Sequence, residues 1–380
     1  MLRKTKNHVK FTTRLENWIL SHTNLDKFDK RKNWVLKHFN RWDTKLLDIR
    51  LNARVNKAFK DNPSIKRDVW SPVLNTQINQ LCSIRACGGK LAEIETLVLQ
   101  LDIAISVVKN LRNLDMLVGI QPMQAPVGLS YLMTYKDAPV TVDGIPQISL
   151  EIQSQAVEAV TRKLQSTWPI EAAQDLMSMH RLDVASEIAS IVGISIAEEI
   201  VEEILVDLFK LAGTPTTVED TVSDEKYKNL FISINKAAIE IARLTRRGMG
   251  NYIICTPYTL ELLKKIYPEV LIPNPAVSTD SVLINYGMIG SIRVIVTNSS
   301  KLDNKILIGY KGRIGETDAG FSYNPYMLVS STGVTIDPQT FQPTVQLLTR
   351  YGKTLLNEKT TRFSKSSHYY AQIDITSYAD

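Results

Sequence analysis

A long helical region between Pro169 and about Leu211 constrains the fold more than any other feature of this chain. Proline is tolerated in the first turn of a helix, so Pro169 suits its beginning. Gly213-Thr214-Pro215 ends it, because glycine adopts the left-handed cap and proline cannot continue a helix. Gly193 predicts a bend. We expect one buried face along this helix, formed by Val184, Ile188, Ile191, Ile196, Ile200 and Ile204.

The segment before this helix predicts a protruding β-hairpin. Residues from Leu129 to Tyr135, and again from Gln147 toward Thr167, are compatible with strands. The residues between them, 136–146, contain two prolines, a glycine and two aspartates, which are typical of turns. We therefore interpret 136–146 as the tip of the hairpin.

The second half of the chain predicts a compact α/β region. A helix is expected from Asp224 to Thr245, followed by a tight glycine-containing turn. The other expected elements are strands at 252–256, 291–297, 305–310 and from 321 onward, and a helix at 257–266. After Gly352 the chain is polar and rich in Ser, Thr and Tyr, so we expect it to be loosely ordered or docked on a neighbour.

The basic charge of the chain is concentrated near its N-terminus. Residues 1–70 hold 18 Lys and Arg against 7 Asp and Glu, a net charge of +11, whereas the whole chain carries +6. A basic arm on a slightly acidic body indicates an anionic partner, either nucleic acid or an acidic protein. A solvated helix surface explains the same charge equally well. The candidate basic residues are Lys30, Arg31, Lys32, Lys37, Arg41 and Lys45.

Three N-terminal patterns carry further expectations. Apolar residues spaced by four and three predict one buried helix stripe, made of Val35, Phe39, Trp42, Leu46 and Ile49. Residues 56–79 lack a sustained period and contain two prolines, so they are interpreted as a linker. Residues 97–108 fit either a strand or a helix face, and a helix is favoured because the apolar run continues to Leu111.

Motifs of common enzymes and cofactor sites do not occur in the sequence. It has no phosphate-binding loop, zinc-binding H-E-x-x-H pair or G-x-S-x-G nucleophile, and its five histidines have no ligand spacing. Cys82, Cys87 and Cys255 are interpreted as free thiols. No apolar run approaches the roughly 18 residues of a membrane span, and no signal-peptide core follows the first residues. We expect no catalytic residue, cofactor or metal, and synthesis in the cytosol.

Several separate strings, in a consistent order, resemble the major capsid proteins of T-even-like tailed bacteriophages. The resemblance spans roughly residues 115–352, and several strings in order are more specific than one motif. The strings are GIQPM at 119–123, APVGL at 125–129, EAAQDL at 171–176, Met179-His180, GMGNYII at 248–254, GYKG at 309–312, DAGFSYNPY at 318–326, FQP at 341–343 and TRYG at 349–352.

The resemblance implies an α+β fold of the Hong Kong 97 type. This fold has an N-terminal arm, an extended loop, a peripheral domain with a long spine helix, and an axial domain near the symmetry axes. We expect the basic arm and helical region at 1–114, the extended loop and peripheral domain at 115–223, the axial domain at 224–320, peripheral strands at 321–352 and a C-terminal tail at 353–380.

The resemblance also implies a function. It predicts a non-enzymatic subunit of hexamers and pentamers that build an icosahedral shell around double-stranded DNA. The expected location is the virion, after synthesis in the host cytoplasm, and the expected partners are further copies, scaffold, portal and decoration proteins and packaged DNA. Two alternatives remain: a protein that coats DNA without closing a shell, and an encapsulin-type compartment of the same fold.

Two features depart from the family pattern, and one region predicts a contact. Arg181 stands where these relatives usually have glycine, so the helix junction is expected to differ in geometry. The extended-loop region is too short for the inserted domain of T-even subunits. We expect Lys136, Asp137 and Asp143 to help set the register of a hairpin that reaches across a neighbouring subunit.

Overall fold

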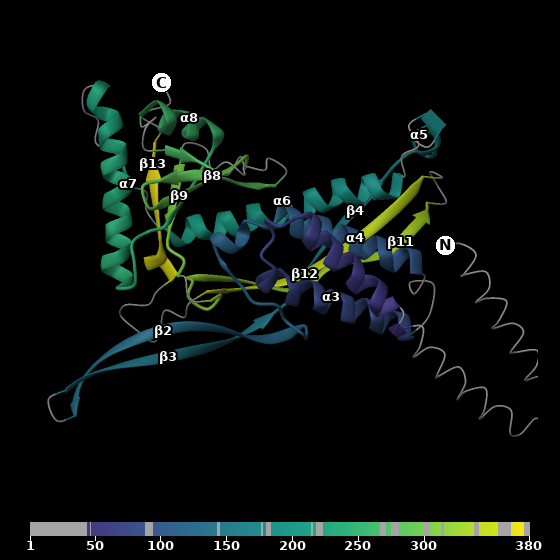
Figure 1. Cartoon of the computed structure of the whole chain (residues 1–380), viewed down its shortest axis with the longest axis horizontal. Coiled ribbons are helices and arrows are strands. Elements are labelled where there is room, and N and C mark those ends of the chain that lie inside the picture. Colours follow the sequence, from purple (N-terminus) through teal and green to yellow (C-terminus); the bar gives the residue numbers. More distant parts are fainter. Residues whose placement is uncertain are drawn as a thin grey trace, which may run out of the picture.

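The computed structural model describes two packed regions and a projecting hairpin (Figure 1). The α+β class expected from the sequence is confirmed, because helices pack on largely antiparallel sheets. The residues that the structure describes are 44–45, 47–87, 94–142, 145–175, 178–179, 184–213, 216–217, 223–266, 271–274, 281–299, 305–312, 315–337, 342–355 and 366–375.

The first region packs helices on a four-stranded sheet with the strand order β1-β11-β12-β4. Buried residues of the helices and of the two central strands form one hydrophobic cluster, which also includes residues of the second region such as Tyr252 and Tyr370. The helices are residues 47–61, α3 (Arg67–Cys87), α4 (Ile94–Asn110) and α6 (Val184–Leu211), with the short η2 (Leu114–Met116) and α5 (Ile170–Asp175). The strands are β1 (Gly119–Ile120), β4 (Val160–Thr167), β11 (Phe321–Ile336) and β12 (Pro343–Leu355).

Within the long helical region that the sequence predicts, the structure has two helices, α5 at its start and α6 from Val184 to Leu211, and α4 lies against α6. Ile196, Ile200 and Ile204 are buried as expected, but Ile191 is 61% exposed. The prediction for Ile191 is wrong because the buried face continues through Val192 instead. The helix runs on through Gly193, where an added Cβ would lie only 2.5 Å from the Ser106 hydroxyl of α4. This glycine therefore permits the close approach of two helices.

The long strand β11 is irregular, and glutamine side chains satisfy its backbone. Its pairing with β12 shifts register at three places, which interrupts the regular ladder. From α3, the Gln77 amide donates to the carbonyl of Val329 (2.6 Å) and accepts from the Leu328 N–H (3.1 Å). Gln100 of α4 donates to the carbonyl of Ser331 (3.0 Å). These bonds fix the helices on the sheet, because buried backbone groups require partners.

The second region is built on a seven-stranded sheet with the order β5-β13-β10-β6-β9-β8-β7. Helices α7 and α8 contact this sheet, and their apolar faces share a second hydrophobic cluster with it. The helices are α7 (Ser223–Thr245), α8 (Pro257–Ile266) and the short η5 (Ser366–Tyr369). The strands are β5 (Thr216–Thr217), β6 (Tyr252–Cys255), β7 (Leu271–Pro273), β8 (Leu283–Ile289), β9 (Ile292–Thr297), β10 (Lys305–Gly309) and β13 (Tyr370–Asp374).

A two-stranded hairpin of β2 (Val127–Val142) and β3 (Ile145–Glu158) projects from the body (Figure 1). This confirms the hairpin expected from the sequence, but not its tip: residues 136–142 belong to β2 and 145–146 to β3, so the strands extend through most of the segment interpreted as the tip. Fourteen residues of β3 correspond to a ribbon of roughly 45 Å. Its register shifts between Ala138 and Thr141, on either side of Pro139, because proline cannot donate a ladder bond. The strand expected toward Thr167 is divided at Ala159, whose N–H donates to the carbonyl of Pro126 (2.9 Å).

The segment interpreted as a linker, 56–79, is helical over most of its length, so that prediction is wrong. Trp70, Leu74 and Ile78 follow one another at intervals of four in α3 and are buried against the first region. Gln77 is also buried on this helix, and a polar residue there obscures the apolar period. Pro72 lies inside α3, in its second turn, so the helix forms although this residue cannot donate a backbone hydrogen bond.

The apolar stripe of the arm is wrong at Ile49, which is 64% exposed. The buried face of residues 47–61 is formed instead by Leu47, Leu51 and Val55. Val35, Phe39, Trp42 and Leu46 lie outside the described residues. The buried side of this helix is therefore a different side from the one expected.

The polar C-terminal segment also departs from expectation. Strand β13 pairs antiparallel with β10 and parallel with β5, inside the seven-stranded sheet. Tyr370 and Ile373 are buried there. This part of the segment is neither loosely ordered nor docked on a neighbour, because five residues with the right register suffice to join a sheet.

Candidate functional site

The base of the hairpin presents one buried face and one exposed apolar face. Ser130 and Val157 face the body and are buried. On the other face, alternating β2 residues and the facing part of β3 expose large apolar side chains, namely Val127 (62%), Leu129 (56%), Tyr131 (46%) and Ile152 (60%). We call these four residues the outer hairpin face. A monomer leaves such a surface in water, which favours contact with another protein.

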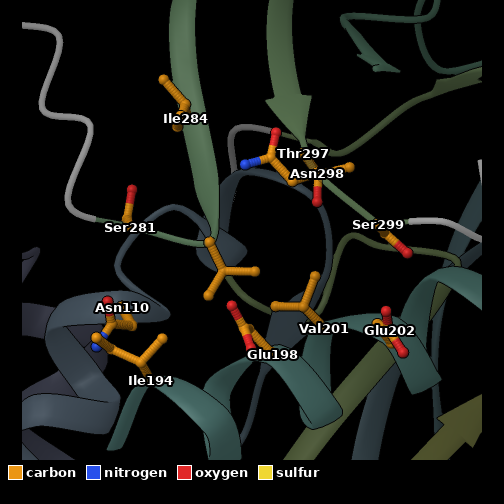
Figure 2. Close-up of a pocket in the computed structure, with 11 residues that line it drawn as sticks. Asn110, Ile194, Glu198, Val201, Glu202, Ser281, Ile284, Thr297, Asn298 and Ser299 are labelled. Carbon is orange, nitrogen blue, oxygen red and sulfur yellow. The ribbon is translucent and has the colours of Figure 1, made fainter. Parts of the chain in front are cut away.

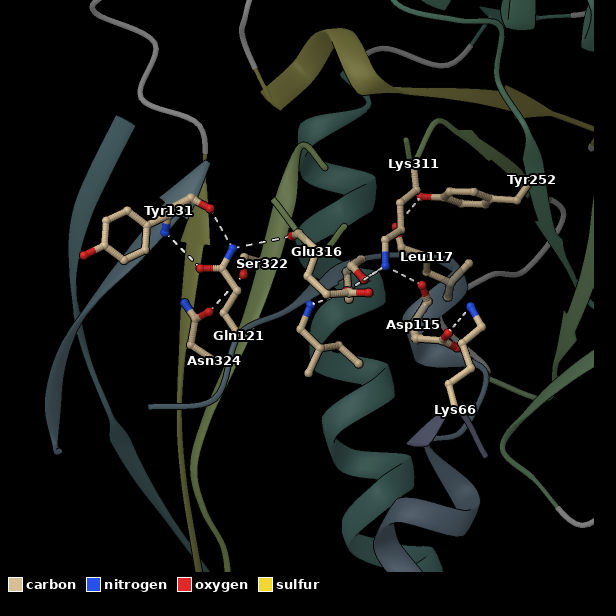
Figure 3. A network of polar contacts seen from close by, with 12 residues as sticks. Lys66, Asp115, Leu117, Gln121, Tyr131, Tyr252, Lys311, Glu316, Ser322 and Asn324 are labelled. Atoms are coloured by element: carbon tan, nitrogen blue, oxygen red, sulfur yellow. Dashed lines mark hydrogen bonds and ion pairs between the residues drawn. The ribbon is translucent and has the colours of Figure 1, made fainter. Parts of the chain in front are cut away.

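The Gln121 side chain fixes the direction in which the hairpin leaves the body (Figure 3). Its amide donates to the carbonyl of Tyr131 (2.6 Å) and accepts from the Tyr131 N–H (2.9 Å). It thus imitates the pairing of a neighbouring strand. The Ser130 hydroxyl donates to the same amide oxygen (3.2 Å). Because both ends of the amide are used, rotation of the strand would cost several hydrogen bonds at once.

Lys311 lies at the centre of a junction network that continues from Gln121 to the body (Figure 3). Its ammonium donates to Glu316 (2.8 Å), to the carbonyl of Val118 (2.8 Å) and to the carbonyl of Asp115. Glu316 also accepts from the Ile120 N–H (2.8 Å). The network therefore joins the segment after β10 to the segment that carries β1 and leads to the hairpin.

Burial dominates the electrostatics of the junction network. Burial lowers the pKa of Lys311, and the nearby Glu316 carboxylate opposes this effect. Burial likewise raises the pKa of Asp115, against the ion pair that Asp115 forms with Lys66. Each charge is expensive to desolvate and depends on its partner, so removal of one partner leaves an uncompensated buried group.

A second polar group, the α6 network, ties the long helix to the sheet. Glu203 accepts from Arg162 of β4 (2.5 Å), from Lys353 of β12 (2.7 Å) and from the Tyr351 hydroxyl. The guanidinium of Arg162 also stacks over the Tyr351 ring at 3.8 Å from its centroid. Burial raises the pKa of Glu203, but these hydrogen bonds outweigh it and lower the pKa to about 2. Glu203 is therefore ionised at neutral pH.

A pocket of about 540 Å³ lies between α6 and the adjoining ends of β8 and β9 (Figure 2). Glu198 and Glu202 of α6 line one side, and Thr297 and Asn298 line the other. Val201 adds an apolar wall. The pocket therefore combines acidic, neutral polar and apolar surface.

The predicted hairpin residues are placed only in part. Lys136 and Asp137 belong to β2 and pair with Ser149 and Ile148 of β3. Asp143 lies outside the described residues. Their contact with a neighbouring subunit stays a prediction.

Of the predicted basic residues, Lys45 is helical and exposed. Lys30, Arg31, Lys32, Lys37 and Arg41 lie outside the described residues. The role of the basic arm therefore also stays a prediction.

Sequence reasoning missed both networks. Gln121 and Lys311 fall within strings that resemble the capsid family, but the strings assigned them no role. Lys311 is 196 residues from Asp115, and Glu203 is 150 residues from Lys353. No local pattern relates residues so distant in the chain.

The described ranges show no cluster of three or more His, Cys, Asp or Glu residues that could hold a metal ion. Within the same ranges, no helix combines the length and apolar character needed to cross a bilayer. Cys255 is buried in β6, and burial raises the pKa of its thiol to about 12, so it packs as a small apolar residue.

Comparison with known families places the chain in a class of structural proteins, the viral capsid proteins. The family model of the major capsid protein Gp23 matches residues 137–375, and the chain belongs to this family. The major capsid protein of Enterobacteria phage T4 is 30% identical over 233 residues, which cover 54% of this chain and 44% of that protein. For Vibrio phage KVP40 the identity is 28% over 232 residues, covering 54% and 45%. The chain thus spans less than half the length of these relatives.

Solved capsid structures are similar at low sequence identity. A chain of Mycobacterium phage Bobi has a TM-score of 0.45 and 9% identity, covering 71% of this chain and 89% of that chain. The virus-like particle from Pyrococcus furiosus has a TM-score of 0.42 and 12% identity, covering 73% and 98%.

Proposed function

We propose that this chain is a major capsid subunit that assembles into hexamers and pentamers of an icosahedral shell around the double-stranded DNA of a tailed phage. Membership of the major capsid protein family over residues 137–375 is the observation that carries this proposal. A shell repeats a few interfaces many times, so modest contacts suffice. We assign the chain no catalytic role. Its proposed location is the virion, after synthesis in the host cytoplasm.

The hairpin supports an assembly role on physical grounds. A two-stranded ribbon is at best marginally stable in water when nothing covers it. The ribbon of this chain is roughly 45 Å long, and its outer hairpin face is exposed and apolar. A neighbouring subunit would cover this face and stabilise the ribbon. We therefore propose that the hairpin reaches across an adjacent copy.

We also propose a domain division that follows the two packed regions. Residues 1–114 form the arm and helical region, 115–223 the extended loop and peripheral domain, and 224–320 the axial domain. Residues 321–352 return to the peripheral sheet. Of the tail, 353–380, we propose that residues 370–374 complete the axial sheet, since β13 pairs with β10.

The direct experiment is to express the chain alone and with its assembly partners, including scaffold, portal and decoration proteins. Negative-stain electron microscopy and an assay for bound nucleic acid then separate the outcomes. Closed particles, or ordered tubes and sheets of hexamers, are the expected result. Persistent monomers that bind DNA would overturn the proposal.

Charge reversal near the hairpin tip is expected to impair assembly. The variant combines Lys136→Glu, Asp137→Lys and Asp143→Lys, which disturbs the proposed register charges. Since exposed charge pairs contribute up to about 1 kcal/mol each, we expect the assembly threshold concentration to rise about tenfold. Light scattering against protein concentration measures it. Glu171→Lys on α5 makes the same net change in charge and is the control; an unchanged threshold in the triple variant would refute the proposed register role.

The basic arm is proposed to contact packaged DNA or an internal scaffold. Deletion of residues 1–43 removes most of the candidates and spares Leu47, Leu51 and Val55, which are buried in the core. We expect DNA binding by the full chain to weaken steeply between 50 and 200 mM salt, roughly tenfold for every two phosphate contacts. Fluorescence anisotropy with a short duplex measures this. Equal DNA affinity and equal packaging after deletion would remove the basis of the proposal.

A further inference from the structure

The pocket between α6 and the β8–β9 strands carries negative charge that the described part of the chain does not neutralise. Glu198 and Glu202 are four residues apart, so they lie on the same face of α6. Neither carboxylate forms an ion pair or side-chain hydrogen bond within the described ranges. Glu203, on the neighbouring face of the same helix, is paired with Arg162 and Lys353. Like charges at this spacing repel one another, so a cation between them would stabilise the helix.

The opposite wall of the pocket supplies an unused hydrogen-bonding group. Thr297, at the end of β9, is 1% exposed, and its hydroxyl has no partner among the described residues. Figure 2 shows this hydroxyl directed toward the space above Val201 and Glu198. A buried polar group without a partner is costly, and a ligand donor in the pocket would satisfy it.

Size and lining define the class of ligand. A pocket of about 540 Å³ lies within the range of organic-ligand sites and is large for one metal ion with its ligands. Val201 and Ile284 contribute apolar surface beside the two carboxylates. Methylene groups would contact the apolar surface, and an ammonium would bind the carboxylates. Arg112, which donates to the lining residue Ser281 (3.3 Å), adds positive charge at that wall, so a cation in the pocket would lie away from it and toward the α6 carboxylates.

We propose that this pocket binds an aliphatic ammonium group, a positively charged amine at the end of a methylene chain. Glu198 and Glu202 hold the ammonium, Val201 and Ile284 contact the methylenes, and the Thr297 hydroxyl accepts from a second donor. The same chemistry is presented by a free diamine or polyamine and by a lysine side chain of a second copy. The site does not depend on the proposed shell, since a single chain forms it.

Titration calorimetry tests the free-amine source on the full chain at low salt, with 1,4-diaminobutane and spermidine as probes. We expect saturable binding, weakened at least tenfold by combining Glu198→Gln and Glu202→Gln, because charge-assisted hydrogen bonds are lost. Glu199→Gln is the matched control on the same helix, outside the pocket lining, and should change affinity less than about twofold under the same principle. 1-Butanol, which lacks the ammonium, should not bind.

Thr297→Val keeps the side-chain shape and removes the hydroxyl. We expect about fivefold weaker binding of spermidine, together with an unchanged or higher melting temperature of the unliganded chain. A purely structural role of this hydroxyl would instead lower the melting temperature.

The second source is tested by assembly in amine-free buffer. If the free amines do not bind, the ligand is expected to be a lysine of a second copy. In that case the double glutamine variant should need about tenfold more protein to assemble, while Glu199→Gln should assemble normally. Circular dichroism confirms that the variant is folded. Equal amine binding by all variants, or no binding together with normal assembly of the double variant, would overturn the inference. Particles would still form in the latter case, so the proposed function would stand.

Discussion

Replacing Lys311 with methionine is expected to lower the free energy of unfolding by about 3–5 kcal/mol, the usual cost of removing one partner of a buried ion pair. The side chain is 8% exposed, and its ammonium serves Glu316 and two backbone carbonyls. Methionine fills the space but leaves these three groups without their donor. Urea-induced unfolding followed by circular dichroism measures the change.

Two further variants test whether the loss of stability comes from the junction network or from the removal of any positive charge. Lys163→Met removes an exposed lysine from β4 and should change stability by less than about 0.5 kcal/mol. Glu316→Gln in the Lys311→Met background should recover part of the loss, because it removes the half-buried carboxylate charge that Lys311 had balanced. A loss below about 1 kcal/mol in Lys311→Met, or no coupling between the two positions, would contradict this account of the junction network.

Replacing Glu203 with glutamine is expected to destabilise the chain by about 2–3 kcal/mol at pH 7, after allowance for a side chain that is about one-third exposed. Burial raises the pKa of this carboxyl, and the hydrogen bonds from Arg162, Lys353 and Tyr351 lower it from 4.5 to about 2. A carboxyl whose pKa is lower in the folded state contributes stability above its unfolded pKa. That contribution is lost as the pH falls from about 4.5 to about 2.

The pH dependence provides the test for Glu203. The stability difference between the original chain and Glu203→Gln should be constant above about pH 5 and should shrink as the pH falls toward 2. Denaturant unfolding at a series of pH values measures this difference. Glu199→Gln, at an exposed position of the same helix, should show no comparable trend. A difference that is independent of pH would mean that the ionised carboxylate does not stabilise the α6 network.

The elements with strong local signals were predicted from the sequence. The long helix that ends near Leu211, a hairpin before it, and helices α7 and α8 occur where expected, although the strands of the hairpin extend into the segment expected to be its tip. Segments with mixed signals were not. Trp70 and Leu74 belong to a buried helix, but the buried Gln77 and Pro72 concealed its period. Ile49 was assigned to the wrong face, because a stripe displaced by two positions is the one that packs.

The candidate site likewise has features that the sequence predicts and features that it does not. The hairpin was foreseen because turn residues and alternating strands are local features. Gln121, Lys311 and Glu203 were not, because their partners come from segments far away in the chain. A hydrogen bond between such residues exists only after the sheets and helices have packed.

By itself, the sequence determined the α+β class, the order of the main helices and strands, the basic charge near the N-terminus and the resemblance to capsid proteins. These depend on local periodicity, turn chemistry and composition, all of which are properties of neighbouring residues. Only the tertiary structure decided that β13 joins the seven-stranded sheet, that α3 is buried, and that two polar networks fix the hairpin and the long helix. Such pairings depend on burial and on distances in space, which no local pattern of residues contains.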